Sequence, residues 1–167
     1  AITYGRDLAE GIWTDRPDFP AGPVTVLDDA VCGQSFGEKR KAVMEKVGEE
    51  GADGFLLTKL DDLMWLFNIR GCDVECNPVA MCYAYLTKDE TILFIQKSAL
   101  GKAVEDDLAA KGIRVEEYGG IVDYLGALPQ GGRVLVDGRY CSYCLYKTLA
   151  GRQTMVEKKN PTELLKA

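Results

Sequence analysis

Residues 54–67 read GFLLTKLDDLMWLF and join a short apolar run to an amphipathic repeat. The run at 54–58 predicts a strand that is buried on both faces. From 60 to 67, apolar residues recur at i, i+3, i+4 and i+7, which predicts a helix with one buried face. Asp61 and Asp62 stand in its first turn, where the helix dipole favours negative charge. A buried strand followed directly by a helix indicates a layered α/β fold.

A second helix is expected just before this pair. Ser35 is followed three residues later by Glu38, the spacing of a capping box, in which each side chain accepts a hydrogen bond from a backbone amide. The helix is predicted over 36–50, with Val43 and Val47 on its buried face.

Strands and helices alternate along the rest of the chain. Strand formers dominate 79–86 and 91–95, with a hairpin turn at 88–90 between them. The elements expected after the hairpin are helix 98–111, strand 113–118, helix 121–128, strand 133–136, helix 141–150 and strand 154–156. This order predicts an α/β fold with a mixed central sheet and helices on both faces.

The composition excludes several classes of protein. The chain has 167 residues, about one domain, and 20 basic against 26 acidic residues give a net charge of −6. No nucleic-acid partner is expected of an acidic chain without a basic stripe, and no apolar run reaches the roughly 18–20 residues of a membrane span. The sequence has no histidine, which excludes a Ser-His-Asp triad, a Cys-His pair and a His-ligated zinc site.

Six cysteines leave three interpretations open. Three residues separate Cys72 from Cys76 and two separate Cys141 from Cys144, spacings that suit a four-thiolate zinc site or a redox C-x-x-C motif. Neither pair shows the tight glycine turn of a zinc knuckle, so free thiols in or near the core are preferred. With no apolar leader at the N-terminus, we expect reduced thiols and a cytoplasmic protein.

Both ends of the sequence have features that are typical of connections to further polypeptide. Residues 14–23 (TDRPDFPAGP) hold three prolines, which favours an extended connection. Asn160 and Pro161 predict a helix start, with asparagine as the cap and proline at the first helical position. So little chain follows that the natural polypeptide is expected to continue.

Several segments, taken in order, resemble a known family. The longest is 58–71 (TKLDDLMWLFNIRG), and the others are 12–17, 35–39, 73–74, 77–79, 83–85, 93–95 and 159–163. Together they resemble the middle domain of the long, three-domain Xaa-Pro aminopeptidases (aminopeptidase P) of the creatinase/prolidase group. Each segment is short, but the ordered set covers essentially the whole chain.

The resemblance implies a ribonuclease-H-like fold and a catalytic domain that is separate from it. Residues 1–23 would be a linker or remnant of a preceding domain, 24–158 the creatinase/prolidase N-terminal-like domain, and 159–167 the start of a catalytic pita-bread domain. That catalytic domain would supply two aspartates, two glutamates and a histidine to a pair of divalent metals, with manganese expected. It would remove the N-terminal residue from peptides with proline second.

On this view the chain itself has no catalytic residue, no metal ligand and no bound cofactor, and is inactive alone. Its partner is the catalytic domain of the same polypeptide, it meets peptide substrate only within the full enzyme, and a homodimer is one expectation for that enzyme. The resemblance makes Arg70 and Asn77, in the loop 70–78, the candidates to face the cleft. For Arg70 a tether to backbone carbonyls is the alternative, and for Asn77 an Asx-turn.

Two competing functions remain open from the residues. One is a stand-alone binding or interaction module, and the other is a thiol protein that uses Cys141 and Cys144. Asp61 and Asp62 are not expected to form a metal or proton-sharing pair, because adjacent helix positions point about 100° apart.

Overall fold

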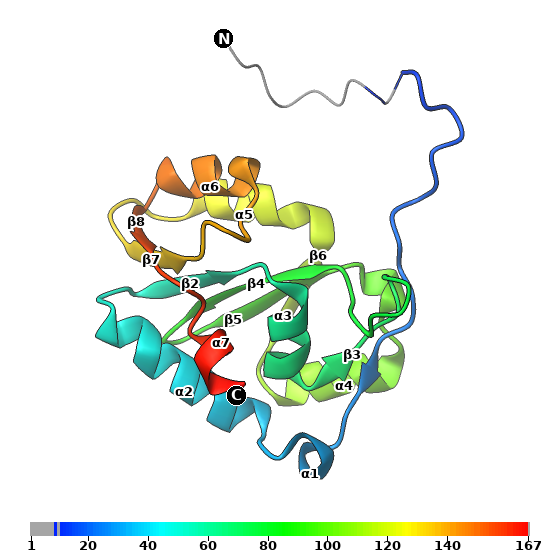
Figure 1. The fold of residues 1–167 in the computed structure, drawn as a ribbon, viewed down its shortest axis with the longest axis horizontal. Coiled ribbons are helices and arrows are strands. Elements are labelled where there is room, and N and C mark those ends of the chain that lie inside the picture. The colour runs from blue at the N-terminus through cyan, green and yellow to red at the C-terminus, as the bar shows by residue number, and fades with distance from the viewer. Residues whose placement is uncertain (1–8, 10, 167) are drawn as a thin grey trace.

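A six-stranded mixed sheet forms the centre of the molecule, with strand order β6-β5-β4-β2-β7-β8 (Figure 1). The computed structural model describes residue 9 and residues 11–166. The strands are β2 (Gly54–Leu57), β4 (Cys82–Thr87), β5 (Thr91–Ile95), β6 (Arg114–Glu117), β7 (Arg133–Val136) and β8 (Thr154–Glu157). Strand β2 runs antiparallel to β4 and parallel to β7, which confirms the predicted mixed sheet.

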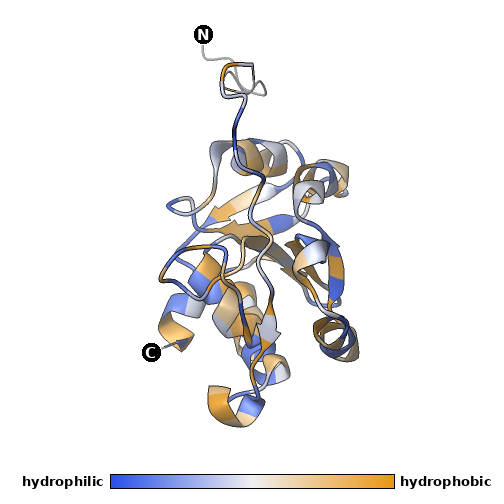
Figure 2. Cartoon of the chain, turned by 90° about the vertical axis from the view of Figure 1, so that its right-hand side faces the viewer, coloured by the Kyte–Doolittle hydropathy of each residue, from blue (hydrophilic) through white to orange (hydrophobic). Residues whose placement is uncertain are grey.

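Helices cover both faces of the sheet, as the sequence predicts. Alternate side chains of β2 divide between the faces: Phe55 and Leu57 join one buried cluster and Leu56 the other. The first face packs against α2 (Phe36–Glu49), α3 (Leu60–Phe67) and α4 (Lys102–Ala110), and the second against α5 (Ile121–Ala127) and α6 (Tyr143–Ala150). Apolar residues follow the central strands (Figure 2), and each large side chain so buried stabilises the fold by about 1.5–3 kcal/mol.

The capping box at the start of α2 is confirmed. The Ser35 hydroxyl accepts from the Glu38 amide at 3.3 Å, and the Glu38 carboxylate accepts from the Ser35 amide at 2.8 Å. Hydrogen bonds from the Ser35 hydroxyl and amide lower the pKa of the Glu38 carboxyl, since both favour its charged form.

A buried lysine joins α2 to the C-terminal end of α3. Lys39 is 2% exposed, and its Nζ donates to the Asn68 side-chain oxygen at 2.5 Å and to the Trp65 carbonyl at 3.0 Å. Asn68 ends α3 in a left-handed conformation (φ 54°), and its amide nitrogen donates to the Asp29 carboxylate at 2.8 Å. Burial lowers the pKa of the Lys39 ammonium. The end of α3 is therefore fixed by side chains from two other segments.

Three predicted boundaries move for local reasons. The helix expected over 98–111 divides at Gly101, which is extended and caps α4, while Lys97–Ala99 form a separate 3₁₀ turn. Helix α6 starts later than expected because the Ser142 hydroxyl caps the Leu145 amide. Strand β4 starts at Cys82, since the preceding residues hydrogen-bond to the loop around Asp73.

A small ribbon beside the main sheet was not predicted from the sequence. Strand β1 (Thr25–Val26) pairs antiparallel with β3 (Ile69–Arg70), and the four-residue helix α1 (Asp29–Cys32) follows β1. Two-residue strands and one-turn helices have no usable periodicity. The ribbon matters because it places Arg70 at the start of the candidate loop.

The C-terminal helix α7 (Thr162–Leu165) begins later than predicted, and the expected Asn160 cap is wrong. Pro161 is the capping residue, while the side chain of Asn160 is turned inward and is 2% exposed. The Asn160 backbone amide donates to the carboxylate of Asp137 at 3.0 Å. This long-range contact holds the backbone just before α7.

Gly71 is a position where only glycine fits. A Cβ there would lie 2.6 Å from the Ala80 backbone nitrogen. We expect Gly71→Ala to lower the free energy of unfolding by about 1–3 kcal/mol, measured by urea denaturation. Gly48→Ala, at an exposed helical site with open space, is the matched control and should stabilise by about 0.5–1 kcal/mol. Equal effects of the two substitutions would contradict this account.

Candidate functional site

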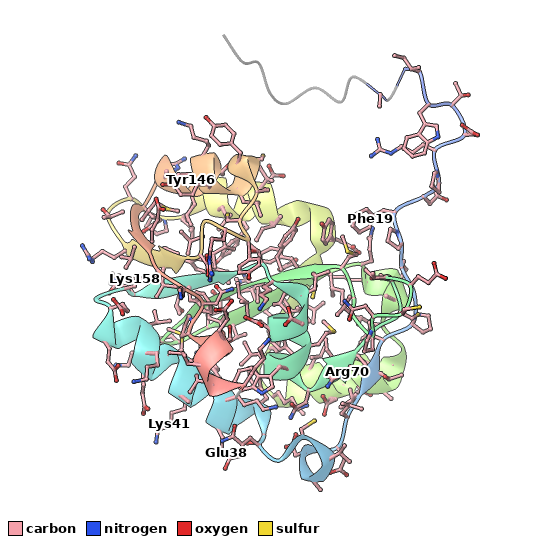
Figure 3. All side chains as sticks on the ribbon, viewed as in Figure 1. Phe19, Glu38, Lys41, Arg70, Tyr146 and Lys158 are labelled. Atoms are coloured by element: carbon pink, nitrogen blue, oxygen red, sulfur yellow. The ribbon has the colours of Figure 1, made fainter. Side chains whose placement is uncertain are left out.

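The candidate loop 70–78 begins at Arg70, the second residue of β3, which follows α3 (Figure 3). Arg70 is half-buried, and its Nη1 donates to the carbonyls of Ile69 at 2.8 Å and Met64 at 3.2 Å. The Met64 carbonyl lies in the last turn of α3 and also accepts from the backbone amide of Asn68, the capping residue of that helix. Arg70 therefore acts as a tether, the alternative that the sequence left open, through at least one of its nitrogens.

Asn77 lies at the exposed end of the same loop. Its backbone amide donates to the Val74 carbonyl at 3.1 Å, which closes a tight turn with Cys76 in a left-handed conformation (φ 59°). The Val79 amide, which an Asx-turn would direct to the Asn77 side chain, donates to the Asn77 backbone carbonyl at 2.8 Å. The Asn77 side chain is exposed, and it takes no part in that hydrogen bond.

Asp73 is a key loop residue that sequence reasoning missed. Its Oδ1 accepts from the Gly22 amide and its Oδ2 from the Met81 amide, both at 2.7 Å. One carboxylate thereby joins the proline-rich lead-in to the start of β4. The lead-in makes a second contact through Phe19, whose ring centroid lies 4.5 Å from that of Tyr118. No short-range motif marks Asp73, because its two partners lie 51 and 8 residues away along the chain.

The first turn of α3 carries a polar cluster that reaches α7. Asp62 is fully buried, and its carboxylate accepts from the Thr162 hydroxyl and from the Lys166 ammonium. Lys166 also pairs with Asp61 at 2.6 Å, so the neighbouring aspartates share one cation despite their divergent directions. The predicted role in the helix dipole is therefore incomplete, because both carboxylates have a specific partner.

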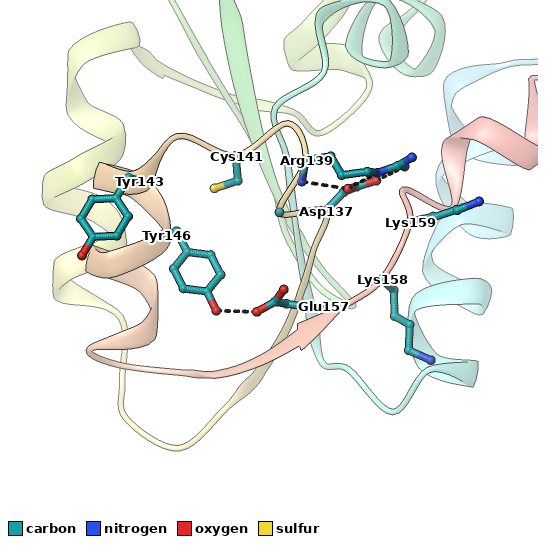
Figure 4. A pocket seen from close by; sticks show the side chains of 9 residues that line it. Asp137, Arg139, Cys141, Tyr143, Tyr146, Glu157, Lys158 and Lys159 are labelled. Carbon is teal, nitrogen blue, oxygen red and sulfur yellow. Dashed lines mark hydrogen bonds and ion pairs between the residues drawn. The ribbon is translucent and has the colours of Figure 1, made fainter.

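A hollow of about 680 Å³ lies where β7 and β8 end at their carboxyl side (Figure 4). Tyr146 donates to the Glu157 carboxylate across it. On its other side Arg139 forms a two-bond fork with Asp137, Nε to Oδ1 at 2.9 Å and Nη2 to Oδ2 at 2.6 Å. These hydrogen bonds from Arg139 lower the pKa of the Asp137 carboxyl. Asp137 with Arg139 and Tyr146 with Glu157 therefore satisfy one another in pairs.

The metal and thiol interpretations depend on how the acidic side chains and the cysteines are placed. Within the described part of the chain, no group of three or more His, Cys, Asp or Glu side chains is placed to hold a metal ion. All six cysteines are free, and burial raises the pKa of the Cys141 thiol to about 11. A reactive cysteine needs the opposite shift. The described residues also contain no helix with the length and apolar character needed to cross a bilayer.

Comparison with known proteins identifies the fold and the family. Residues 15–167 match the sequence profile of the creatinase/prolidase N-terminal domain. The chain belongs to this family, which confirms the resemblance found in the sequence.

Curated relatives are Xaa-Pro aminopeptidases. The chain is 40% identical, over 75% of its length, to the probable Xaa-Pro aminopeptidase P of Coprinopsis cinerea. It is 32% identical, over 97% of its length, to the protein of the same name from Tuber melanosporum. It spans only 20% and 29% of those two proteins.

A solved structure shows the same relation. The X-prolyl aminopeptidase of Caenorhabditis elegans, described as a cytosolic enzyme with a di-nuclear active site, matches with a TM-score of 0.83 and 25% identity. The match covers 92% of this chain and 26% of that enzyme.

The tether role of Arg70 can be tested by Arg70→Met. Losing the two carbonyl contacts should lower the free energy of unfolding by about 1–2 kcal/mol. Arg152→Met, at an exposed arginine, is the control and should change stability by less than about 0.5 kcal/mol. Chemical denaturation measures both, and an unchanged stability of Arg70→Met would contradict the tether.

The Arg139–Asp137 fork predicts a pH effect. A carboxyl with a lowered folded pKa stabilises the fold fully above its unfolded pKa, and this contribution is lost as the pH falls further. Asp137→Asn should therefore cost about 1–2 kcal/mol at neutral pH, discounted because Arg139 is half-exposed.

The difference in stability between Asp137→Asn and the parent chain should shrink below about pH 3.9. Thermal unfolding at a series of pH values measures this difference. Asp106→Asn, at an exposed ion pair with Lys102, should show little change at any pH. A cost for Asp137→Asn that persists undiminished in acid would exclude the ionic explanation.

Proposed function

We propose that this chain is the non-catalytic middle domain of a three-domain Xaa-Pro aminopeptidase. The observation that carries the proposal is the match over 75% and 97% of the chain to two aminopeptidases of which it spans only 20% and 29%. The division into 1–23, 24–158 and 159–167 stays a prediction, as does the ribonuclease-H-like description of the fold.

The donor set of this chain does not fit a two-metal centre. A metallopeptidase site needs several convergent ligands, and the sequence has no histidine, while the described residues contain no ligand group of the required kind. The two divalent ions, for which manganese is our expectation, therefore belong to residues outside this chain. The catalytic domain would use them on peptides with proline in the second position.

The contribution of this domain would be to shape the cleft. Loop 70–78 is held rigidly at Arg70 and Asp73, while Asn77 presents an exposed amide. A fixed backbone with a free polar tip suits a residue that contacts substrate or borders its path. We retain Arg70 and Asn77 as the cleft candidates, with Asn77 the freer of the two. A cytoplasmic homodimer is the proposed setting.

The proposal makes a direct prediction for the purified 167-residue chain. With manganese present, it should not hydrolyse a peptide with proline second, because it lacks the groups that would hold the ions. The same chain extended by its natural downstream sequence should do so. Liberation of the N-terminal residue, followed by chromatography, measures both. Metal-dependent turnover by the short chain would overturn the non-catalytic assignment.

A further inference from the structure

Helix α7 is held on the domain by side chains from α3 and from the end of β7. It has only four residues, yet Thr162 is fully buried, and the helix packs against both α2 and α3 (Figure 1). Isolated helices this short do not persist in water. Its position must come from tertiary contacts, and three sets of contacts provide it.

The first set is the buried carboxylate of Asp62. It accepts from the Thr162 hydroxyl and the Lys166 ammonium, while Lys59 lies 3.5 Å away. A buried carboxylate without donors is strongly disfavoured. If α7 left the domain, Asp62 would lose two of these partners at once. The need of the buried carboxylate for donors therefore opposes the undocking of α7.

The second and third sets fix the direction of the segment. Asp137, which follows β7, accepts from the Asn160 backbone amide at 3.0 Å. Glu163 meets Lys59 at 3.5 Å and Arg139 at 3.4 Å. Contacts with two separate elements, at both ends of residues 160–166, define an orientation as well as a location. We call Asp62, Thr162 and Lys166 the α7 latch.

The α7 latch and the candidate cleft loop stand at opposite ends of one helix. Asp62 lies in the first turn of α3, and Arg70 follows its last turn, so about 7.5 Å of helix, from Asp62 to Phe67, lies between the latch and the segment that leads to the loop. Lys39 and Asn68 hold the far end of that helix. A shift of α7 relative to α3 is therefore a shift relative to loop 70–78.

We propose that Asp62 and Thr162 are positioning residues of the aminopeptidase: they set the orientation of the polypeptide that follows α7 relative to loop 70–78. This inference rests on the proposed function, in which a catalytic domain follows. The family description as an N-terminal domain supports that order. A small misplacement of groups around a cleft, even one caused by a mutation far from the chemistry, can strongly reduce the rate of catalysis.

The test uses the full-length enzyme with Thr162→Val, which removes the hydroxyl and keeps the shape. We expect kcat/KM for a peptide with proline second to fall about tenfold, with metal content unchanged. Thr162→Ser, which keeps the hydroxyl, should restore kcat/KM to within about twofold. The matched control is Thr91→Val, because Thr91 is 2% exposed and its hydroxyl accepts from Arg40 at 2.7 Å, away from α7. It should lower the Tm but leave kcat/KM unchanged.

The outcomes separate the two claims. An active parent enzyme whose kcat/KM is unaffected by Thr162→Val would overturn the positioning role alone. Equal losses in Thr162→Val and Thr91→Val would also overturn it, since general destabilisation would then explain both. A full-length parent enzyme with no Xaa-Pro activity would overturn the proposed function and this inference with it.

Discussion

The buried carboxylate of Asp62 is the constraint on which the C-terminal part of this structure depends. Its charge lies inside the fold, where it needs donors, and Thr162 and Lys166 supply two of them. Those donors come from α7, a helix too short to exist alone, and from the residue that ends it. The buried Asp62 carboxylate and α7 therefore stabilise each other. The segment after Asn160 consequently packs against the rest of the structure.

Helix α3 transmits this constraint across the domain. Leu63, Leu66 and Phe67 are fully buried in the main core, so the helix cannot shift without disturbing the packing. At its far end Lys39 donates to Asn68, and Arg70 donates back to the Met64 carbonyl. A helix fixed at both ends and along one face makes a rigid reference between the segment leaving the domain and the loop proposed to border the cleft.

Local patterns were sufficient to predict most of the fold. The Ser35–Glu38 capping box, the period of α3 and the residues of β5 all depend on neighbours in sequence, and the structure confirms them. The predicted Asn160 cap is wrong: Pro161 holds the capping position, and the Asn160 backbone amide bonds to Asp137, 23 residues earlier. The roles of Asp73 and Thr162 were not predicted for the same reason. Their partners, Gly22 and Asp62, lie 51 and 100 residues away. The site was less predictable than the sheet because its geometry rests on such distant pairs.

Native-state hydrogen exchange of this chain tests the docking of α7 most directly. The Lys166 amide donates to the Thr162 carbonyl within α7, and the Leu63 amide donates to the Lys59 carbonyl at the start of α3. If the latch binds the two helices into one cooperative unit, both amides should exchange with similar opening free energies. Rapid exchange at Lys166, with Leu63 still protected, would show that α7 frays independently and would contradict the account.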